Sequence, residues 1–290
     1  MIAQRTLLLA CVLAATGFAA AACGERREPT NSTGDVYPLT VTTAGERALV
    51  VRSPARRIAV LDTGPEQILL ALGAGSRVVG RPVTEGGVIE LDKLVAAKPD
   101  LIVADSSFDD VALSRATARA KAPVYVAPSD SIRDVERAIT QLGLITESQV
   151  AARRLVRSIE QAKRRVAATV RQRPAVSVFV DVGLSITVSN QTLIGDLIRE
   201  AGGLNVAGDD HGKRVVDLSE LAALDPDIYL ATSDSQTTLA GLRKLPGAKK
   251  VRAIRERRFA VIDAALLQPG PSIDAGLLEL ARILHPDAFR

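Results

Sequence analysis

Aromatic residues are scarce in this chain of 290 residues, which has no tryptophan, three tyrosines and five phenylalanines. Proteins that bind single-stranded nucleic acid stack bases on aromatic side chains that lie beside basic ones. Here the net charge of +4 comes mostly from scattered arginines, and no basic run is interleaved with aromatics. Nucleic acid is therefore not an expected partner, although a basic surface can favour anionic ligands or membranes.

The signature motifs of several enzyme classes are missing as well. The sequence contains no P-loop, no Gly-x-Ser-x-Gly elbow and no His-Glu-x-x-His. Gly73-Ala74-Gly75 follows an expected helix rather than a strand, so it is not a dinucleotide fingerprint. We therefore expect a protein that is not an enzyme and that holds no cofactor.

Residues that could ligate a metal ion or act as nucleophiles are few, because the chain has two histidines and two cysteines. His285 lies near the chain end and is expected to serve packing. His211 lies beside Asp209 and Asp210 and could ligate a metal, but charged loops flanked by glycine are usually solvated turns, and we predict no metal site. Cys23 is assigned to lipid below, which leaves no internal disulfide and no cysteine nucleophile.

Residues 1–22 have the pattern of an export signal peptide, in which Arg5 precedes an apolar run rich in leucine and alanine. The run is short for a membrane-spanning helix and ends in small residues. Residues 20–24 (AAACG) resemble the lipobox of bacterial lipoproteins. We predict cleavage before Cys23 and lipidation of Cys23, with a soluble secreted protein or an uncleaved anchor as alternatives.

Residues 23–38 form a predicted flexible tether, because they are polar and contain few apolar side chains. A lipid anchor followed by such a tether would hold the folded part on the extracytoplasmic side of the cell membrane, in a periplasm or at the outer face. We therefore expect a membrane-anchored lipoprotein that works beside a membrane partner.

The longest periodic segment of the chain spans residues 147–171 and predicts one long helix. Its apolar residues recur every three or four positions and share one face: Leu155, Ile159, Ala162, Val166 and Val170. Thr146 and Gln149 have the spacing of a capping box, and Pro174 follows the helix. At about 1.5 Å per residue the helix is about 37 Å long. We interpret it as a rigid strut between two lobes, and the alternative is an ordinary helix packed on one domain.

Strand and helix patterns alternate on both sides of this helix. A hairpin is expected over residues 39–51, and strands are expected at 57–62, 77–80, 101–104, 124–127, 176–181, 228–231 and 259–263. Helices are expected at 66–72, 91–97, 111–120, 131–142, 193–201, 218–224 and 273–284, with Thr63 and Glu66 as a capping box and Gly143 as a break. Short units of this kind predict mostly parallel sheets covered by helices.

Two segments of the chain can be aligned without a gap, namely 91–104 (LDKLVAAKPDLIVA) and 218–231 (LSELAALDPDIYLA). They lie on opposite sides of the long helix, which argues for two similar lobes. We predict an α/β fold with a first lobe over residues 39–130, connecting helices over 131–173 and a second lobe over 174–290.

Open α/β sheets bind ligands at the carboxyl ends of their strands. The residues expected to bind a ligand at these ends are Asp62, Thr63, Arg81, Ser106 and Phe108 in the first lobe, and Leu184, Ser185, His211, Arg214 and Ser233 in the second. Two such edges that face each other would form a cleft suited to a small molecule.

Several motifs, taken in order along the chain, resemble one known family. They are residues 57–61 (RIAVL), 70–80 (LALGAGSRVVG), 98–102 (KPDLI), 201–206 (AGGLNV), 225–227 (DPD), 269–271 (PGP) and 284–286 (LHP). The ordered set, from about Leu39 to Arg290, resembles the substrate-binding proteins of ABC importers for iron complexes and cobalamin, in the class with a helical backbone. The resemblance implies a monomer that captures a metal chelate between its lobes and delivers it to an ABC permease and its ATPase.

The resemblance also implies one acidic residue on each lobe that docks on arginines of the permease. In this chain those positions fall at Asp92, where the family usually has glutamate, and at Ser219, where the neighbouring Glu220 could substitute. The alternative is that both are ordinary acidic residues at helix starts, favoured by the helix dipole.

The ligand is expected to be a ferric siderophore, with cobalamin or haem as alternatives. Corrinoids and haem are usually gripped by aromatic side chains, and few are present. The segment between Gly80 and Lys98 is short for the family, and Ser272 replaces its usual arginine. Arg81 and Arg214 are candidate contacts for anionic groups of the chelate.

Two other classes of protein remain open from the sequence. Some metal chelatases have two α/β lobes, and His211 with Asp209 or Asp210 could assist metal insertion. A lipid-anchored sensor with an empty cleft is the other. Turnover of a tetrapyrrole with metal would indicate the chelatase, and neighbouring permease genes would indicate the importer.

Overall fold

A computed structural model describes residues 37–183, 185–209 and 212–289 of the chain. In its first half, four parallel strands form a sheet in the order β4-β3-β5-β6. The strands are β3 (Ile58–Val60), β4 (Val78–Gly80), β5 (Leu101–Ala104) and β6 (Val124–Val126). β3 and β5 lie in the middle of the sheet and are buried along their whole length. This explains why both read as unbroken apolar runs.

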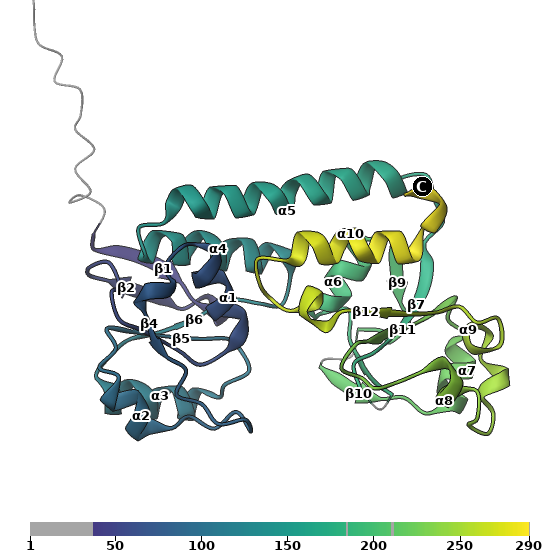
Figure 1. Cartoon of the computed structure of the whole chain (residues 1–290), viewed down its shortest axis with the longest axis horizontal. Helices are drawn as coiled ribbons and strands as arrows, with labels where there is room; N and C mark the ends of the chain where they lie inside the picture. Colours follow the sequence, from purple (N-terminus) through teal and green to yellow (C-terminus); the bar gives the residue numbers. More distant parts are fainter. Residues whose placement is uncertain (1–36, 184, 210–211, 290) are drawn as a thin grey trace, which may run out of the picture. The chain divides into compact units, whose positions relative to one another are not determined.

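Helices follow each strand of this first sheet, as the alternating pattern predicts. They are α1 (Thr63–Ala71), α2 (Leu91–Ala96), α3 (Asp110–Ala120) and α4 (Ile132–Ile145). Leu94 of α2 and Leu113 and Ala116 of α3 pack in one apolar cluster with alternate residues of β3 and β5. Figure 1 shows α2 and α3 on one side of the sheet and α4 on the other. A separate hairpin of β1 (Leu39–Thr42) and β2 (Ala48–Val51) precedes the sheet.

The second half of the chain forms another four-stranded parallel sheet, in the order β12-β11-β7-β9. Its strands are β7 (Val176–Asp181), β9 (Gly203–Asn205), β11 (Ile228–Thr232) and β12 (Phe259–Ile262). Its helices are α6 (Leu193–Glu200), α7 (Leu218–Leu224), α8 (Leu239–Leu242), α9 (Arg252–Arg255) and α10 (Ile273–Leu284). Phe179, Tyr229 and Phe259 lie side by side in its core, with ring centroids 5.1 Å and 5.8 Å apart.

The two sheets confirm the expected α/β fold with two similar lobes. The helix–Pro–Asp–strand repeat occurs once in each, as α2 to β5 and as α7 to β11. In the first lobe Asp100 accepts hydrogen bonds from the backbone amides of Arg56 and Arg57, at 2.8 Å and 3.0 Å. In the second, Asp227 accepts from the amide and the hydroxyl of Ser177, at 2.9 Å and 2.7 Å. Each aspartate therefore ties its own strand to the start of the neighbouring strand.

The long helix α5 (Gln149–Val170) contacts α4 from the first half and α10 from the second, so it does not pack on one lobe alone (Figure 1). Ile159, Ala162 and Val166 on its apolar face are buried. Its connection to the second half includes a hydrogen bond from the Ser158 hydroxyl to the Asp274 carboxylate. Pro38–Arg290 forms one compact unit. The described residues contain no helix long and apolar enough to cross a membrane.

The predicted break at Gly143 is wrong. α4 continues to Ile145, and Gly143 lies where α4 and α5 approach closely, since a Cβ there would be 2.5 Å from the Cβ of Ala152. The capping box at Thr146 is also wrong, because the Thr146 hydroxyl donates to the Leu142 carbonyl of the preceding helix at 2.7 Å. A small residue near a helix end can break or cap the helix, or it can allow a close contact with another helix. The sequence alone does not distinguish these roles.

The predicted cap of α1 is wrong by one residue. Asp62 caps this helix, with its carboxylate 2.9 Å from the amide of Gly64, and Thr63 is the first residue of the helix. Three short strands were not predicted, namely β8 (Ile186–Val188), β9 and β10 (Lys213–Val215). β8 and β10 pair antiparallel outside the main sheet. Each has three residues, too few for a periodic pattern to identify.

Short 3-10 helices lie between these elements or follow them. They are η2 (Ala44–Glu46), η3 (Gly75–Arg77), η4 (Ala248–Lys250), η5 (Ala264–Leu267) and, after α10, η6 (Pro286–Ala288). η5 packs tightly on α10, because a Cβ on Gly276 would lie 2.0 Å from the carbonyl oxygen of Leu266. The two halves also touch at Gly64, where a Cβ would lie 2.6 Å from the carbonyl oxygen of Pro269.

Candidate functional site

We call the carboxyl ends of β3, β4 and β5, with the loops beside them, the first-lobe edge. A cavity of about 520 Å³ opens there. It is lined by Leu61, Asp62, Thr63, Arg81, Val83, Thr84, Glu85, Gly86, Gly87, Ser107 and Phe108. Four of the predicted ligand-binding residues, Asp62, Thr63, Arg81 and Phe108, therefore lie together. Ser106 is not among the lining residues, and its hydroxyl is 3.1 Å from that of Ser129.

The guanidinium of Arg81 already has partners within this edge. It donates to the Thr63 hydroxyl at 2.7 Å and lies 3.8 Å from the carboxylate of Glu66. Its side chain remains half exposed. Arg81 can therefore reach a ligand. It would then either interact with Glu66 and the ligand at once or give up its contact with Glu66.

Carboxylates crowd the first-lobe edge. Burial raises the pKa of Asp62, and repulsion from Asp105 adds to that rise, while the Gly64 amide and Arg81 oppose it. Burial also raises the pKa of Asp130, with further repulsion from Asp134 and Asp105. Like charges held close together in partly dry surroundings destabilise each other, so this edge is poised to accept positive charge or hydrogen-bond donors.

Three carboxylates of this edge were not predicted from the sequence, namely Asp105, Asp130 and Glu85. Asp105 follows the last residue of β5 directly, so the rule that places ligands at strand ends could have found it. Asp105 accepts hydrogen bonds from the amide and the hydroxyl of Ser107, at 2.9 Å and 2.5 Å. Asp130 and Glu85 come from loops whose path only the fold defines.

At the corresponding ends of β7 and β11, which we call the second-lobe edge, a fully buried carboxylate organises the loops. Asp181 has no exposed surface and accepts from the amides of Gly183 and Ser185, at 2.8 Å and 3.1 Å. It also accepts from the hydroxyls of Tyr229 and Thr237, at 2.7 Å and 2.6 Å. Burial, followed by the hydrogen bond to this carboxylate, raises the pKa of Tyr229. Asp181 was not predicted.

The predicted residues of the second-lobe edge have structural partners. Ser185 donates its amide to Asp181, and the Ser233 hydroxyl accepts from the amide of Ala264 at 3.0 Å. Arg214 forms a close ion pair with Glu220 and donates to the carbonyl of Ala207 at 3.3 Å.

Leu184 and His211 lie outside the described residues. The alternative of a metal site at His211 involves Asp210, which is also outside them. Among the residues with described placement, no group of three or more histidine, cysteine or acidic residues could hold a metal ion. Asp209 accepts from the side-chain amide of Asn190 at 3.0 Å. His285, expected to pack, is buried with Nε2 3.2 Å from the Gly202 carbonyl oxygen.

The two candidate docking acids differ in their availability. The side chain of Asp92, in the first turn of α2, is 97% exposed and lies 3.2 Å from Arg119. Glu220, in the first turn of α7, is held by Arg214. The signal peptide, Cys23 and the tether up to residue 36 lie outside the described residues.

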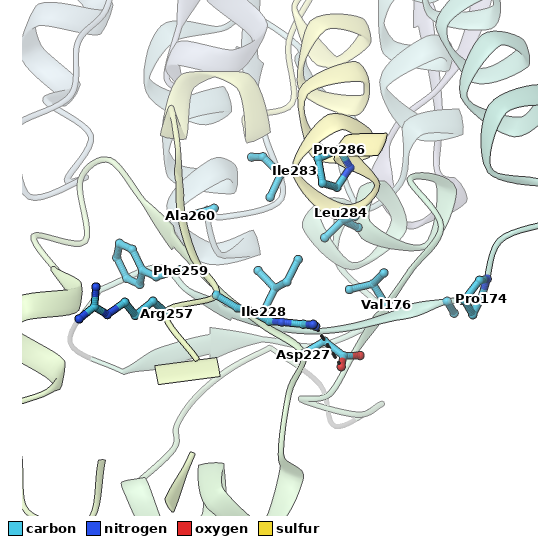
Figure 2. A pocket seen from close by; sticks show the side chains of 12 residues that line it. Pro174, Val176, Asp227, Ile228, Arg257, Phe259, Ala260, Ile283, Leu284 and Pro286 are labelled. Carbon is cyan, nitrogen blue, oxygen red and sulfur yellow. Dashed lines mark ion pairs between the residues drawn. The ribbon is translucent and has the colours of Figure 1, made fainter. Parts of the chain in front are cut away.

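A larger groove of about 650 Å³ lies at the opposite end of the second sheet, at the starts of β7, β11 and β12 (Figure 2). Val176, Ile228 and Ile283 form part of its lining, and Asp227 pairs with Arg258 at its margin (Figure 2). Burial alone would raise the pKa of Asp227, but the hydrogen bonds of Ser177 and the nearby guanidinium groups outweigh it and lower the pKa. Parallel sheets bind ligands at the other end, so we place the candidate site at the carboxyl ends.

The family model for periplasmic binding proteins matches residues 83–266, which include part of the first-lobe edge and most of the second lobe. The chain belongs to the periplasmic binding protein family.

Individual relatives of this periplasmic binding protein are distant in sequence. A cobalamin-binding protein of Halobacterium salinarum is 23% identical over 278 residues, covering 86% of this chain and 74% of the relative. A solved periplasmic binding protein from Veillonella parvula is 16% identical with a TM-score of 0.74, over 86% of this chain and 97% of that one. The ABC-type Fe3+-hydroxamate transport system of Saccharomonospora viridis is 22% identical with a TM-score of 0.68, over 85% and 99% of the two chains. These structures show that the fold is shared.

Proposed function

We propose that this periplasmic binding protein is the solute-binding component of an ABC importer, and that it captures a metal chelate between its two lobes. The observation that carries the proposal is the family match over residues 83–266. The polar side chains at the carboxyl ends of both sheets support it, because a small polar solute needs hydrogen-bonding groups from both sides. The helices α4, α5 and α10, which connect the halves, support a stiff frame with little hinge motion.

The proposed ligand is a ferric siderophore. Phe108 is the single aromatic residue among those lining the first-lobe cavity, and a flat macrocycle would be served better by several aromatic faces. The fold shared with an Fe3+-hydroxamate transport protein is compatible with this ligand.

Cobalamin is the second candidate, because the curated relative from Halobacterium salinarum is a cobalamin-binding protein that aligns over 86% of this chain. Haem is a further alternative of the same importer type. All three are metal chelates, so the class of ligand is the same in each case.

Delivery would take place at a membrane permease driven by its ATPase. Asp92 is available for docking on permease arginines, whereas Glu220 would first have to exchange Arg214 for a permease partner. The proposed lipid on Cys23 would hold the protein on the extracytoplasmic side of the membrane, within reach of the permease. The protein would work as a monomer.

The proposal excludes catalysis, so the protein should bind its ligand stoichiometrically and leave it chemically unchanged. A chelatase would instead convert a tetrapyrrole and free metal into product with repeated turnover. Mixing purified protein with protoporphyrin and a divalent metal, and following the absorbance of the product, separates these two functions.

A thermal-shift and calorimetry screen of the purified protein tests the proposal. Ferrichrome, cyanocobalamin and haemin are the probes, because a ligand that binds only the native state raises the unfolding midpoint. We expect saturable binding of one of them at a stoichiometry of one. Phe108→Ala should weaken that binding about tenfold, since it removes an aromatic surface from the cavity.

Val150→Ala is the matched control, because Val150 is exposed on α5 and lies outside the cavity. It should leave the affinity unchanged. If no metal chelate raised the midpoint or gave a binding isotherm, the proposed importer function would be wrong, and the sensor with an empty cleft would take its place.

A further inference from the structure

We propose that the first-lobe edge selects metal complexes of positive or zero net charge, and that Asp62 and Asp105 set this preference. The inference rests on the proposed function, since it concerns the ligand of the same site. It reverses the expectation that Arg81 and Arg214 recognise anionic groups of the chelate.

The first observation is the balance of charge around the cavity. Asp62 and Glu85 line it together with Arg81, so carboxylates outnumber cations among the lining residues. Asp105 lies close enough to Asp62 to repel it, and it repels Asp130 as well. A complex with positive charge relieves this repulsion when it binds, whereas an anionic complex adds to it.

The second observation is the state of the two arginines. Arg81 donates to the Thr63 hydroxyl at 2.7 Å and has Glu66 at 3.8 Å. Arg214 is held by Glu220 in a close ion pair and by the Ala207 carbonyl. Both guanidinium groups already face carboxylates, so an anionic chelate would compete with Glu66 and Glu220 for their charge.

The third observation is the chemistry that the edge offers to a neutral ligand. Carboxylates accept hydrogen bonds and do not donate them, and the donors to Asp62 are backbone amides of its own turn, with the Gly64 amide at 2.9 Å. Amide and ammonium groups on the outside of a chelate supply the donors that these oxygens lack. Ligands of this kind are neutral peptide-based hydroxamates and hydroxamates with a free amine.

The test is a calorimetric comparison of ferric complexes that differ in charge. Ferrioxamine B carries a protonated amine, ferrichrome is neutral, and ferric enterobactin is anionic. We expect the first or second of these to bind at least about tenfold more tightly than the third at low ionic strength. Added salt should reduce this difference in affinity, because salt screens the interactions between exposed charges.

Two substitutions assign the preference to residues. Asp62→Asn and Asp105→Asn remove one charge each, and asparagine retains the ability of Asp62 to cap α1. Each should reduce the discrimination between ferrioxamine B and ferric enterobactin about threefold to tenfold, and the double variant should reduce it further. Glu279→Gln makes the same change of charge on α10 and is the control, since Glu279 does not line the cavity.

Each outcome has a defined meaning. Tighter or equal binding of ferric enterobactin in the unmodified protein overturns this inference and leaves the proposed function intact. Unchanged discrimination in the folded double variant, as judged by its circular dichroism and unfolding midpoint, also overturns it. Absence of binding to every complex, cyanocobalamin and haemin included, overturns both the proposed function and the inference.

Discussion

Asp62 in the first lobe and Asp181 in the second each lie at the carboxyl end of a central strand, but they have very different surroundings. Asp181 is completely buried, and its side-chain oxygens accept four hydrogen bonds, from two loops and from Tyr229 of β11 in its own lobe. Asp62 lines a cavity, accepts only from backbone amides of its own turn and is repelled by Asp105. The same topological position therefore serves internal structure in one lobe and remains available to a ligand in the other.

The contrast between Asp62 and Asp181 shows that two lobes with the same repeat can use corresponding residues in different ways. Both lobes contain the helix–Pro–Asp–strand unit, and the aspartate of the unit ties two strand starts together in each. The amino ends of the two sheets are thus alike, while the carboxyl ends have diverged. Substitutions at the amino ends of the two sheets should therefore have similar effects on stability, and substitutions at the carboxyl ends should have different effects.

The largest expected effect follows from Asp181→Ala. Removal of this carboxylate leaves two amides and two hydroxyls unsatisfied inside the protein, which should lower the free energy of unfolding by about 3 kcal/mol. Asp105→Ala, at the exposed first-lobe edge, should cost less than about 1 kcal/mol. Urea unfolding of both variants measures the contrast. Equal losses would show that the two edges do not differ as the structure indicates.

An intermediate effect is expected at the Pro-Asp units. Asp227→Ala removes two hydrogen bonds with Ser177 and ion pairs with Arg252 and Arg258, and should cost about 2 kcal/mol. Asp100→Ala removes two bonds to exposed backbone amides and should cost about 1 kcal/mol.

The pKa of Asp227 is lowered in the folded protein, so its contribution to stability is present above pH 3.8 and is lost as the pH falls below that value. Unfolding midpoints measured from pH 7 down to pH 3 should therefore fall less steeply for Asp227→Ala than for the unmodified protein. A variant with the same slope as the unmodified protein would contradict this assignment.

The smallest effect is a gain in stability at the first-lobe edge. The pKa of Asp62 is raised, so the folded protein holds that proton more tightly than the unfolded chain does, and stability is lost as the pH rises above 3.8. Asp105→Asn removes the repulsion and should raise the free energy of unfolding by a few tenths of a kcal/mol at pH 7. The gain should shrink as the pH falls through the raised pKa of Asp62, because protonation of Asp62 removes the repulsion. A loss of stability at pH 7 would indicate that the bonds of Asp105 to Ser107 outweigh the repulsion.

Much of the fold could be predicted from the sequence, because it depends on local patterns. β5, β7, α7 and α10 have the expected bounds, since continuous apolar runs and helical periodicity follow from burial of strands and helix faces. The capping residues could not be assigned with the same success. Asp62 and Thr63 are both good caps, and only the path of the backbone decides between them.

Part of the candidate site could also be predicted. Asp62, Thr63, Arg81 and Phe108 were expected at strand ends and do line one cavity. The role of Asp181 was missed because its partners Tyr229 and Thr237 are distant in sequence. Arg81 and Arg214 were expected to contact anionic groups of the chelate. Residue type alone could not show that they pair with Glu66 and Glu220, because this pairing depends on side-chain positions.

The sequence by itself determined the parallel α/β architecture, the two-lobe repeat and the scarcity of aromatic and metal-binding side chains. These features follow from composition and from periodicities of two and 3.6 residues, which act over short stretches of chain. Only the tertiary structure decided which carboxylates are buried and bonded and which remain open to a ligand. Burial and electrostatic repulsion act between residues that are close in space, and the order of residues along the chain does not contain those distances.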